Sequence, residues 1–189
     1  SHTIVDAPPA VLARMRRDGW CDRCAVRAQR WQDAVDDPAF GPFDAVFFDT
    51  YAESYADMKR FFLALPRVLR KPHGIFSFFN GMCPFNVFFH GVACQLVLLE
   101  LDRIGLQLEY VPLKVDHLPD ATWRGVKRRY WIFDTYHLPI ARWKPPALQA
   151  QDAGDDTTTG AAPPSHRAEN AAAGGATAVA RDDAARALP

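Results

Sequence analysis

The sequence lacks any uninterrupted apolar segment long enough to cross a membrane. Its longest apolar segment, Val87 to Leu101, is interrupted by His90, Gln95 and Glu100. A membrane-spanning helix needs about 20 mostly apolar residues. We therefore predict a buried helix of a globular domain here, and no membrane partner.

A net excess of charge is also missing, because 22 basic side chains balance 22 acidic ones. The segment from Leu148 onward holds six of the acids and three of the arginines, which leaves 19 basic and 16 acidic side chains in the first 147 residues. Domains that bind nucleic acids usually carry a clustered basic face. This small excess does not indicate one, so no nucleic-acid partner is expected.

Cysteine is scarce, and four cysteines in a chain of 189 residues do not form a disulfide scaffold. No signal-peptide pattern precedes them, so we expect a reducing compartment, cytoplasmic or nuclear. Cys21 and Cys24 have the spacing of metal ligands, but structural zinc normally needs four ligands and no second pair is evident. The sequence therefore predicts no metal site.

Aromatic residues are absent from Leu148 to the C-terminus, where Ala, Gly, Asp, Thr and Pro dominate. Ordering a chain costs roughly 1–2 kcal/mol per residue, and this composition offers little apolar burial to offset it. We expect one domain over residues 1–147 and a disordered tail over residues 148–189. Because the chain opens at Ser1 without methionine and enters a predicted strand at once, we expect a fragment of a larger domain.

The first 105 residues alternate predicted strands with predicted helices, which favours an α/β fold with a mainly parallel sheet. Two further strands have no helix between them, so we expect them to form an antiparallel pair at one edge. The strands at 45–48 and 75–79 are apolar throughout and are predicted to be buried on both faces. Strands are predicted over residues 2–6, 25–29, 45–48, 75–79, 107–115 and 129–133, and helices over 7–19, 34–35 (after a turn at 31–33), 53–70 and 85–104.

The carboxyl end of the strand at 45–48 is the first candidate site, because ligands of α/β sheets collect beyond the carboxyl ends of the strands. Asp49 is the first polar residue there, where a carboxylate can orient a cationic nitrogen and accept its proton. Thr50 and Glu53 fit the capping-box pattern, which explains them without a function. Asn80 ends the next strand at the same edge.

Asp6 ends the first predicted strand and allows two interpretations. Such an acid can accept hydrogen bonds from ribose hydroxyls in a Rossmann-like unit, or it can cap a helix or lie in a solvated turn. The glycine-rich loop that accompanies a ribose-binding acid would lie about 20 residues upstream, before Ser1. Both interpretations stay open.

The segment Trp123–Trp131 mixes cations with aromatic residues. It is predicted to be an edge strand with Lys127 and Arg129 on its wet face, where edge lysines also block unwanted pairing. A role facing a substrate stays open, because the hairpin is expected near the carboxyl ends of the strands.

Three segments together resemble the type IV protein arginine N-methyltransferases, fungal and plant enzymes that methylate the delta nitrogen of arginine and are similar to guanidinoacetate N-methyltransferase. The resemblance covers about residues 1–143. It rests on Phe43-Asp-Ala-Val-Phe-Phe-Asp-Thr-Tyr51, Pro72-His-Gly-Ile-Phe-Ser-Phe-Phe-Asn-Gly81 and Trp123-Arg-Gly-Val-Lys-Arg-Arg-Tyr-Trp131.

The resemblance implies a class I methyltransferase with a Rossmann-like seven-stranded sheet ordered 3-2-1-4-5-7-6, the cofactor S-adenosyl-L-methionine, and a protein substrate that carries arginine. Asp49 would be catalytic, gripping the guanidino group. The implied substrate-binding residues are Thr50, Tyr51 and Asn80, and the implied cofactor-binding residues are Asp6, Arg30, Trp31, Gln32 and Asp33.

The sequence departs from this family in one large respect, because the first strand and the glycine-rich loop of the family lie outside the 189 residues. In the family that strand lies between the strands matched by residues 3–6 and 45–48. We therefore expect a truncated sheet, weak cofactor binding and little activity of the fragment itself. A non-catalytic binding module and a nucleotide-binding oxidoreductase domain are the alternative hypotheses.

Overall fold

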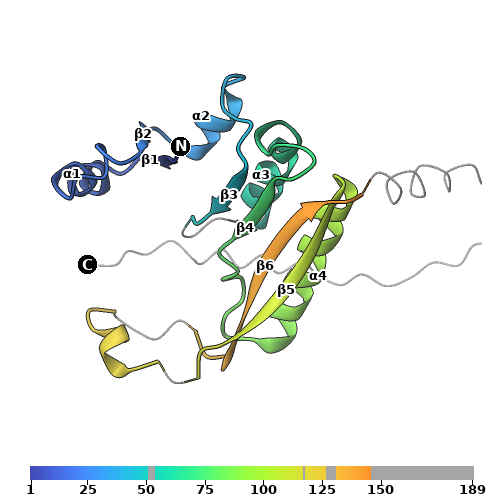
Figure 1. The fold of residues 1–189 in the computed structure, drawn as a ribbon. Helices are drawn as coiled ribbons and strands as arrows, with labels where there is room; N and C mark the ends of the chain where they lie inside the picture. The colour runs from blue at the N-terminus through green and yellow to red at the C-terminus, as the bar shows by residue number, and fades with distance from the viewer. Residues whose placement is uncertain (51–53, 117, 127–130, 146–189) are drawn as a thin grey trace, which may run out of the picture. The chain divides into compact units, whose positions relative to one another are not determined.

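The computed structural model describes residues 1–50, 54–116, 118–126 and 131–145. All described residues belong to one compact unit. The predicted domain boundary near residue 147 and the predicted tail lie outside the described residues. The described elements are β1 (Thr3–Asp6), α1 (Pro9–Arg17), β2 (Ala25–Ala28), α2 (Trp31–Asp36), β3 (Ala45–Phe48), α3 (Tyr55–Val68), β4 (Ile75–Phe78), α4 (Val87–Arg103), β5 (Leu106–Lys114), η1 (Asp120–Trp123) and β6 (Thr135–Trp143) (Figure 1).

The strands form two sheets (Figure 1). β1 pairs with β2 in parallel, and the second sheet has the order β3-β4-β6-β5, with β3 and β4 parallel and β6 antiparallel to both of its neighbours. The predicted parallel pairing of the early strands and antiparallel pairing of the last two are confirmed. Without its first strand, a class I methyltransferase sheet leaves these same two pieces, β2-β1 and β3-β4-β6-β5.

The ends of the helices follow the local sequence. Proline is tolerated in the first turn of a helix, where its missing N–H would have no partner, and Pro9 opens α1 in this way. Gly19 and Gly105 follow α1 and α4 with φ of 72° and 85°, a left-handed conformation that favours glycine. Both predicted helix stops are therefore confirmed. Pro66 does not stop α3, which continues to Val68.

An aromatic core joins α3 to the second sheet. The Phe61 ring of α3 stacks on Phe48 of β3 with centroids 4.1 Å apart, and Phe62 packs edge-on against Phe76 of β4 at 5.9 Å. Fully burying one such side chain is worth about 1.5–3 kcal/mol. The periodicity of residues 58–69 thus predicted the face of α3 that is buried, including Leu65, which is fully inaccessible.

Helix α2 links the two sheets. The Trp31 ring contacts Phe48 and Phe61 edge-on at 5.3 and 5.5 Å, and Asp36 forms an ion pair of 3.0 Å with Arg60 of α3. The predicted turn at residues 31–33 is wrong, because these residues form the first turn of α2. The buried side of the short helix draws Trp31 into the core, which overrides its weak helix propensity.

The prediction that β3 and β4 are buried on both faces is wrong. In β3, Phe48 is 6% exposed but Phe47 is 60% exposed, and in β4 Phe76 is buried whereas Ile75 is 39% exposed. The aromatic side chains of α3 lie against the buried side chains of this sheet, whereas Phe47 and Ile75 are on a face that is partly open to solvent. The apolar strands at 45–48 and 75–79 therefore belong to a sheet that, within the described residues, is buried mainly on one face.

Helix α4 is also covered on one face only, contrary to the prediction of a buried helix. Its buried side chains include His90, Cys94, Val97 and Leu101. The opposite face exposes large apolar side chains to solvent, between 41% and 74% in each case: Val87, Phe88, Phe89, Val92, Leu96 and Leu99. No described helix is both long and apolar enough to span a membrane.

The last strand is displaced from its predicted position. β6 occupies Thr135–Trp143 and pairs with β5 through nine residue pairs, whereas the described residues 131–133 form no strand. The described start of the segment 123–131 lies in a turn, because Asp120–Trp123 form a 3-10 helix and Gly125 has a φ of 83°, which agrees with the loop predicted between the strands at 107–115 and 129–133. Lys127 and Arg129 lie outside the described residues.

Candidate functional site

A cavity of about 890 Å³ lies between β1 and β3, next to α2. Asp6 at the end of β1, Trp31 of α2, and Asp49 and Thr50 at the end of β3 all line it. Four of the predicted site residues are therefore brought together. Arg30, Gln32, Asp33 and Asn80 do not line this cavity, and Tyr51 lies outside the described residues.

Asp49 directly follows β3 and is exposed. Burial raises the pKa of Tyr136 of β6, the hydrogen bond from the Asn80 N–H opposes the rise, and the negative charge of Asp49 adds to it. The Tyr136 ring lies nearly parallel to Phe79, with centroids 6.2 Å apart and an angle of 19°. An exposed carboxylate at the end of a strand can accept the N–H groups of a cationic ligand.

Tyr136 is a residue next to the site that sequence reasoning missed. It belongs to β6, a strand whose predicted position was wrong, and the pairing of β6 with β4 brings its hydroxyl to the Asn80 N–H. No local motif marks it. Tyr136 could have been identified only if the last strand had been predicted over residues 135–143 and next to β4.

Thr50 is not the cap of α3, so its predicted structural explanation is wrong. The capping residue is Ser54, whose hydroxyl accepts from the Asp57 N–H at 3.2 Å while the Asp57 carboxylate accepts from the Ser54 N–H at 3.2 Å. The predicted pair, Thr50 and Glu53, and the observed pair, Ser54 and Asp57, have the same spacing, and the helix begins at the observed pair. The Thr50 hydroxyl is buried at the cavity without a hydrogen-bond partner among the described residues, which leaves it available to a ligand.

Asn80 is 2% exposed and its side chain is already engaged. Its amide nitrogen donates to the His137 carbonyl at 3.0 Å and contacts Cys94 Sγ at 3.5 Å, while its backbone N–H donates to the Tyr136 hydroxyl at 2.9 Å. In this geometry Asn80 fixes the position of Tyr136. Its predicted contact with substrate stays a prediction.

His90 and Cys94 support the same turn from α4. The His90 Nδ1 atom bonds the Met82 carbonyl at 2.7 Å, which makes it the protonated nitrogen and leaves Nε2 facing Cys94 Sγ at 3.7 Å. Among the described residues, no three His, Cys, Asp or Glu side chains gather as a metal site would require. Cys24 is engaged locally, because its thiol donates to the Trp20 carbonyl at 3.2 Å.

The predicted cofactor segment begins α2. Arg30 occupies the N-cap position, and Trp31, Gln32 and Asp33 form the first turn, with Trp31 packed on the core as described above. Asp6 lies at the carboxyl end of β1, in register with Ala28 of β2. Of these residues, Asp6 and Trp31 face the cavity that also holds Asp49.

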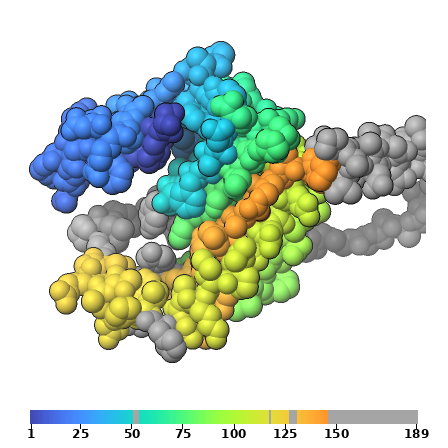
Figure 2. Space-filling view, in the orientation of Figure 1, coloured from blue at the N-terminus to red at the C-terminus, as the bar shows by residue number. Residues whose placement is uncertain are grey.

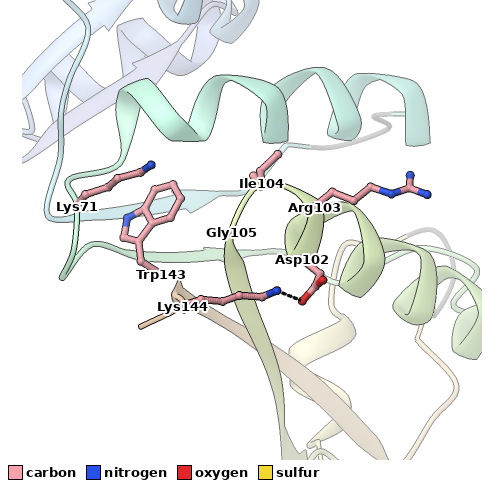
Figure 3. Close-up of a pocket in the computed structure, with 7 residues that line it drawn as sticks. All are labelled: Lys71, Asp102, Arg103, Ile104, Gly105, Trp143 and Lys144. Carbon is pink, nitrogen blue, oxygen red and sulfur yellow. Dashed lines mark ion pairs between the residues drawn. The ribbon is translucent and has the colours of Figure 1, made fainter. Parts of the chain in front are cut away.

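A smaller depression of about 260 Å³ lies at the amino end of β4, away from Asp49 (Figure 3). Lys71 lies over the Trp143 ring, 4.6 Å from its centroid, and Lys144 forms an ion pair of 2.9 Å with Asp102. These cations are engaged by groups of the protein itself. The depression therefore has a structural explanation and is not the candidate site.

No protein-family model matches the chain. Curated fungal proteins named protein arginine N-methyltransferase 2 do match. The Cryptococcus neoformans protein is 37% identical over 155 residues, covering 75% of this chain and 43% of the relative. The Aspergillus fumigatus protein is 37% identical over 148 residues, covering 75% and 34%, and the Saccharomyces cerevisiae protein is 33% identical over 144 residues, covering 73% and 34%.

Among solved structures, the M1.HpyAVI-SAM complex matches 76% of this chain and 54% of its own chain, with 14% identity and a TM-score of 0.36. A TM-score of this size does not support a fold assignment, so the fold is assigned from the strand order described above. The chain spans less than half the length of the curated relatives. It is thus homologous to part of the fungal proteins named protein arginine N-methyltransferase 2, which supports its place in an arginine methyltransferase family.

Proposed function

We propose that this chain is part of an S-adenosyl-L-methionine-dependent enzyme that transfers a methyl group to a guanidino nitrogen of arginine in a protein substrate. The names of the fungal relatives support the reaction and the substrate class. We also propose that it belongs to the type IV group, related to guanidinoacetate N-methyltransferase and specific for the delta nitrogen, because the segments at 43–51, 72–81 and 123–131 resemble that group.

The position of Asp49 carries this proposal. Guanidinium has a pKa above about 12, so its nitrogens are poor nucleophiles until a carboxylate localises the charge and draws off a proton. Asp49 stands at the carboxyl end of β3 and lines the cavity. Its carboxylate can accept two N–H bonds of a guanidinium.

The described residues fit the cofactor in part. Asp6 offers an acceptor for ribose hydroxyls at a strand end, and the unpartnered Thr50 hydroxyl offers a further polar group on the same cavity. When bound, the cofactor supplies the methyl group. Asp6 and Asp49 lie on opposite strands of the cavity, which separates the group that would hold the ribose from the group that would hold the guanidinium.

The test replaces Asp49 in the natural protein that contains this chain. We expect Asp49→Asn to lower methyl transfer at least about 100-fold, because the proton acceptor and the anionic partner are both lost, while cofactor affinity changes little. Radiolabelled methyl transfer and calorimetry measure the two quantities. Asp102→Asn removes a carboxylate at the distant depression and is the matched control. An active Asp49→Asn enzyme would sink the assigned role, and a wild-type protein that binds no cofactor would favour a binding module.

A further inference from the structure

The outer face of α4 is apolar from Val87 to Leu99. Its large side chains, each between 41% and 74% exposed, are Val87, Phe88, Phe89, Val92, Leu96 and Leu99. The inner face packs against β5, where the Tyr110 hydroxyl donates to the Cys94 carbonyl at 3.0 Å, and Figure 2 shows the light green surface of α4 next to the yellow-green surface of β5. β5 and β3 are the opposite edges of the second sheet, and no residue of α4 lines the cavity next to Asp49. The exposed α4 face is therefore a surface separate from the candidate site.

The sequence of α4 follows the pattern of a helix that packs on two sides. Its exposed residues Phe88, Val92, Gln95 and Leu99 follow one another at spacings of four, three and four residues. Alternating steps of three and four keep side chains on one line along a helix, which is the seam of packed helix pairs. A helix with one solvent face carries charged residues there, yet residues 87–99 contain no Asp, Glu, Lys or Arg. The exposed α4 face is therefore suited to a second packing partner.

Gly91 lies on the same face, one turn from Phe88 and one turn from Gln95. Glycine weakens a helix relative to alanine, because it loses more conformational freedom on folding. A Cβ atom at Gly91 would have no neighbour within 4 Å among the described residues beyond its own helix, so the described packing does not require a glycine there. A missing side chain lets another backbone approach closely. Gly91 thus marks where a second helix would come nearest.

We propose that the exposed α4 face binds the same face of a second copy of this chain, with the two helices antiparallel. At about 150–250 Å² for a fully exposed aromatic side chain and less for an aliphatic one, the six side chains offer roughly 600 Å² of apolar surface in each copy. Two such faces together bury about 1,200 Å², the lower limit for a specific interface. A second copy supplies both the area and a matching seam, because a two-fold interface uses one patch twice. We therefore expect a reversible dimer rather than a permanent one.

The charge at the end of α4 sets the direction of the pair. Arg103 lies one turn beyond Leu99 on the same face, and its side chain is 70% exposed. A parallel pair would place the two Arg103 groups side by side, where like charges repel. An antiparallel pair separates them by the length of the helix and sets the two helix dipoles in opposite directions. With the two-fold axis at the middle of the seam, each Phe88 contacts Leu99 of the partner subunit.

Sedimentation equilibrium of the full 189-residue chain, over about 1–500 μM, tests for the dimer. We expect a concentration-dependent dimer, and we expect Leu99→Glu to raise its dissociation constant at least about 100-fold, because each copy would bury a carboxylate without a partner. Leu63→Glu is the matched control, since Leu63 of α3 is 65% exposed and lies outside the exposed α4 face. Circular dichroism should show both variants as helical as the wild type. A wild type that stays monomeric, or equal dimerisation of the two variants, would overturn the proposal.

Disulfide cross-linking tests the direction of the helices. Cys21, Cys24 and Cys83 are first replaced by serine, because these cysteines are at least partly exposed. Copies with Phe88→Cys are then mixed with copies that carry Leu99→Cys and are mildly oxidised. A disulfide needs Cα atoms within about 7 Å, so we expect the mixed dimer to form at least about ten times faster than the dimer of Leu99→Cys copies alone. The reverse order would contradict the antiparallel pair, and a natural protein containing this chain that sediments as a monomer at the same concentrations would assign the face to another segment of that protein.

Discussion

The effect of the Asp49 charge on Tyr136 can be tested at the scale of single residues. One comes from the end of a parallel strand and the other from an antiparallel strand that follows β5, yet the carboxylate acts on the phenol. Burial and the Asp49 charge raise the pKa of Tyr136, so its neutral form is favoured well into the alkaline range.

Removing the negative charge of Asp49 should change the pKa measured for Tyr136. We expect Asp49→Asn to lower the pKa of Tyr136 toward its ordinary value of 10.0, because a repelling negative charge is removed. A raised tyrosine pKa costs stability only as the pH rises past that ordinary value, where the unfolded chain ionises first. Ultraviolet absorbance of the phenolate measures the shift, with Tyr136→Phe to assign the signal. Identical Tyr136 titration curves for the wild type and Asp49→Asn would show that Asp49 and Tyr136 do not interact.

The sequence predicted the acids at the strand ends but not their neighbours. Asp6 and Asp49 follow apolar runs directly, and the rule that ligands lie beyond the carboxyl ends of strands places both at one cavity. Tyr136 depends on which strands pair, which local periodicity does not reveal. Thr50 was assigned to a cap because the pattern that begins at Ser54 ends in an aspartate rather than the usual Glu or Gln.

At the scale of elements, α3 is the central support of the second sheet, and its ends are set by local chemistry. Its capping box satisfies two backbone donors, and its buried face carries the aromatic contacts to β3 and β4. It also reaches α4, because Lys59 and Tyr55 both bind the Glu100 carboxylate, at 2.9 and 3.1 Å. Both features can be tested by single substitutions.

Removing the Ser54 cap should lower the free energy of unfolding, whereas removing the Thr50 hydroxyl should not. We expect Ser54→Ala to lower the free energy of unfolding by about 1 kcal/mol, because the Asp57 N–H loses its acceptor. Thr50→Val keeps the shape and removes an unpartnered buried hydroxyl, so it should be neutral or slightly stabilising. Urea unfolding compares the two variants. The reverse order of stabilities would restore Thr50 as the structural residue.

The link between α3 and α4 should depend on acid pH. The bond from Lys59 lowers the pKa of Glu100, burial opposes the shift, and the Tyr55 bond lowers it further. A lowered carboxyl pKa adds stability that is present above the ordinary value of 4.5 and is lost as the pH falls through the value in the folded state.

We therefore expect Glu100→Gln to lose less stability than the wild type on acidification below about pH 4.5, because it has no carboxylate to protonate. Urea unfolding at a series of pH values measures the difference. Glu109→Gln, on the exposed side of β5, is the matched control and should follow the wild type. A Glu100→Gln profile parallel to that of the wild type would contradict the link.

At the scale of the whole described unit, the two sheets are joined by side-chain contacts and not by a shared strand. Within the described residues no strand joins β1 to β3, and the link consists mainly of α2 with its Trp31 contacts and the Asp36–Arg60 ion pair. The strand alternation predicted the parallel pairs, and the family order predicted where the sheet is interrupted. The one-sided covering of β3 and α4 was not predictable, because an apolar run looks the same whether or not its partner is present.

Thermal unfolding should therefore be poorly cooperative. We expect the β1–β2 sheet to open before the β3-β4-β6-β5 sheet, with a calorimetric enthalpy larger than the van't Hoff enthalpy. Differential scanning calorimetry and hydrogen exchange of β1 and β6 amides measure the two effects. A single sharp transition with equal enthalpies would show that α2 couples the sheets fully.

The exposed face of α4 has a practical consequence for the handling of this protein. Its row of large apolar side chains, from Val87 to Leu99, faces water on a helix that is otherwise well packed. Sulfate and similar salts are excluded from protein surfaces and so strengthen the association of apolar patches. Salting-out should therefore set in at lower ammonium sulfate than for a chain with a polar α4 face, which makes salt fractionation an early purification step and argues for buffers low in sulfate afterwards.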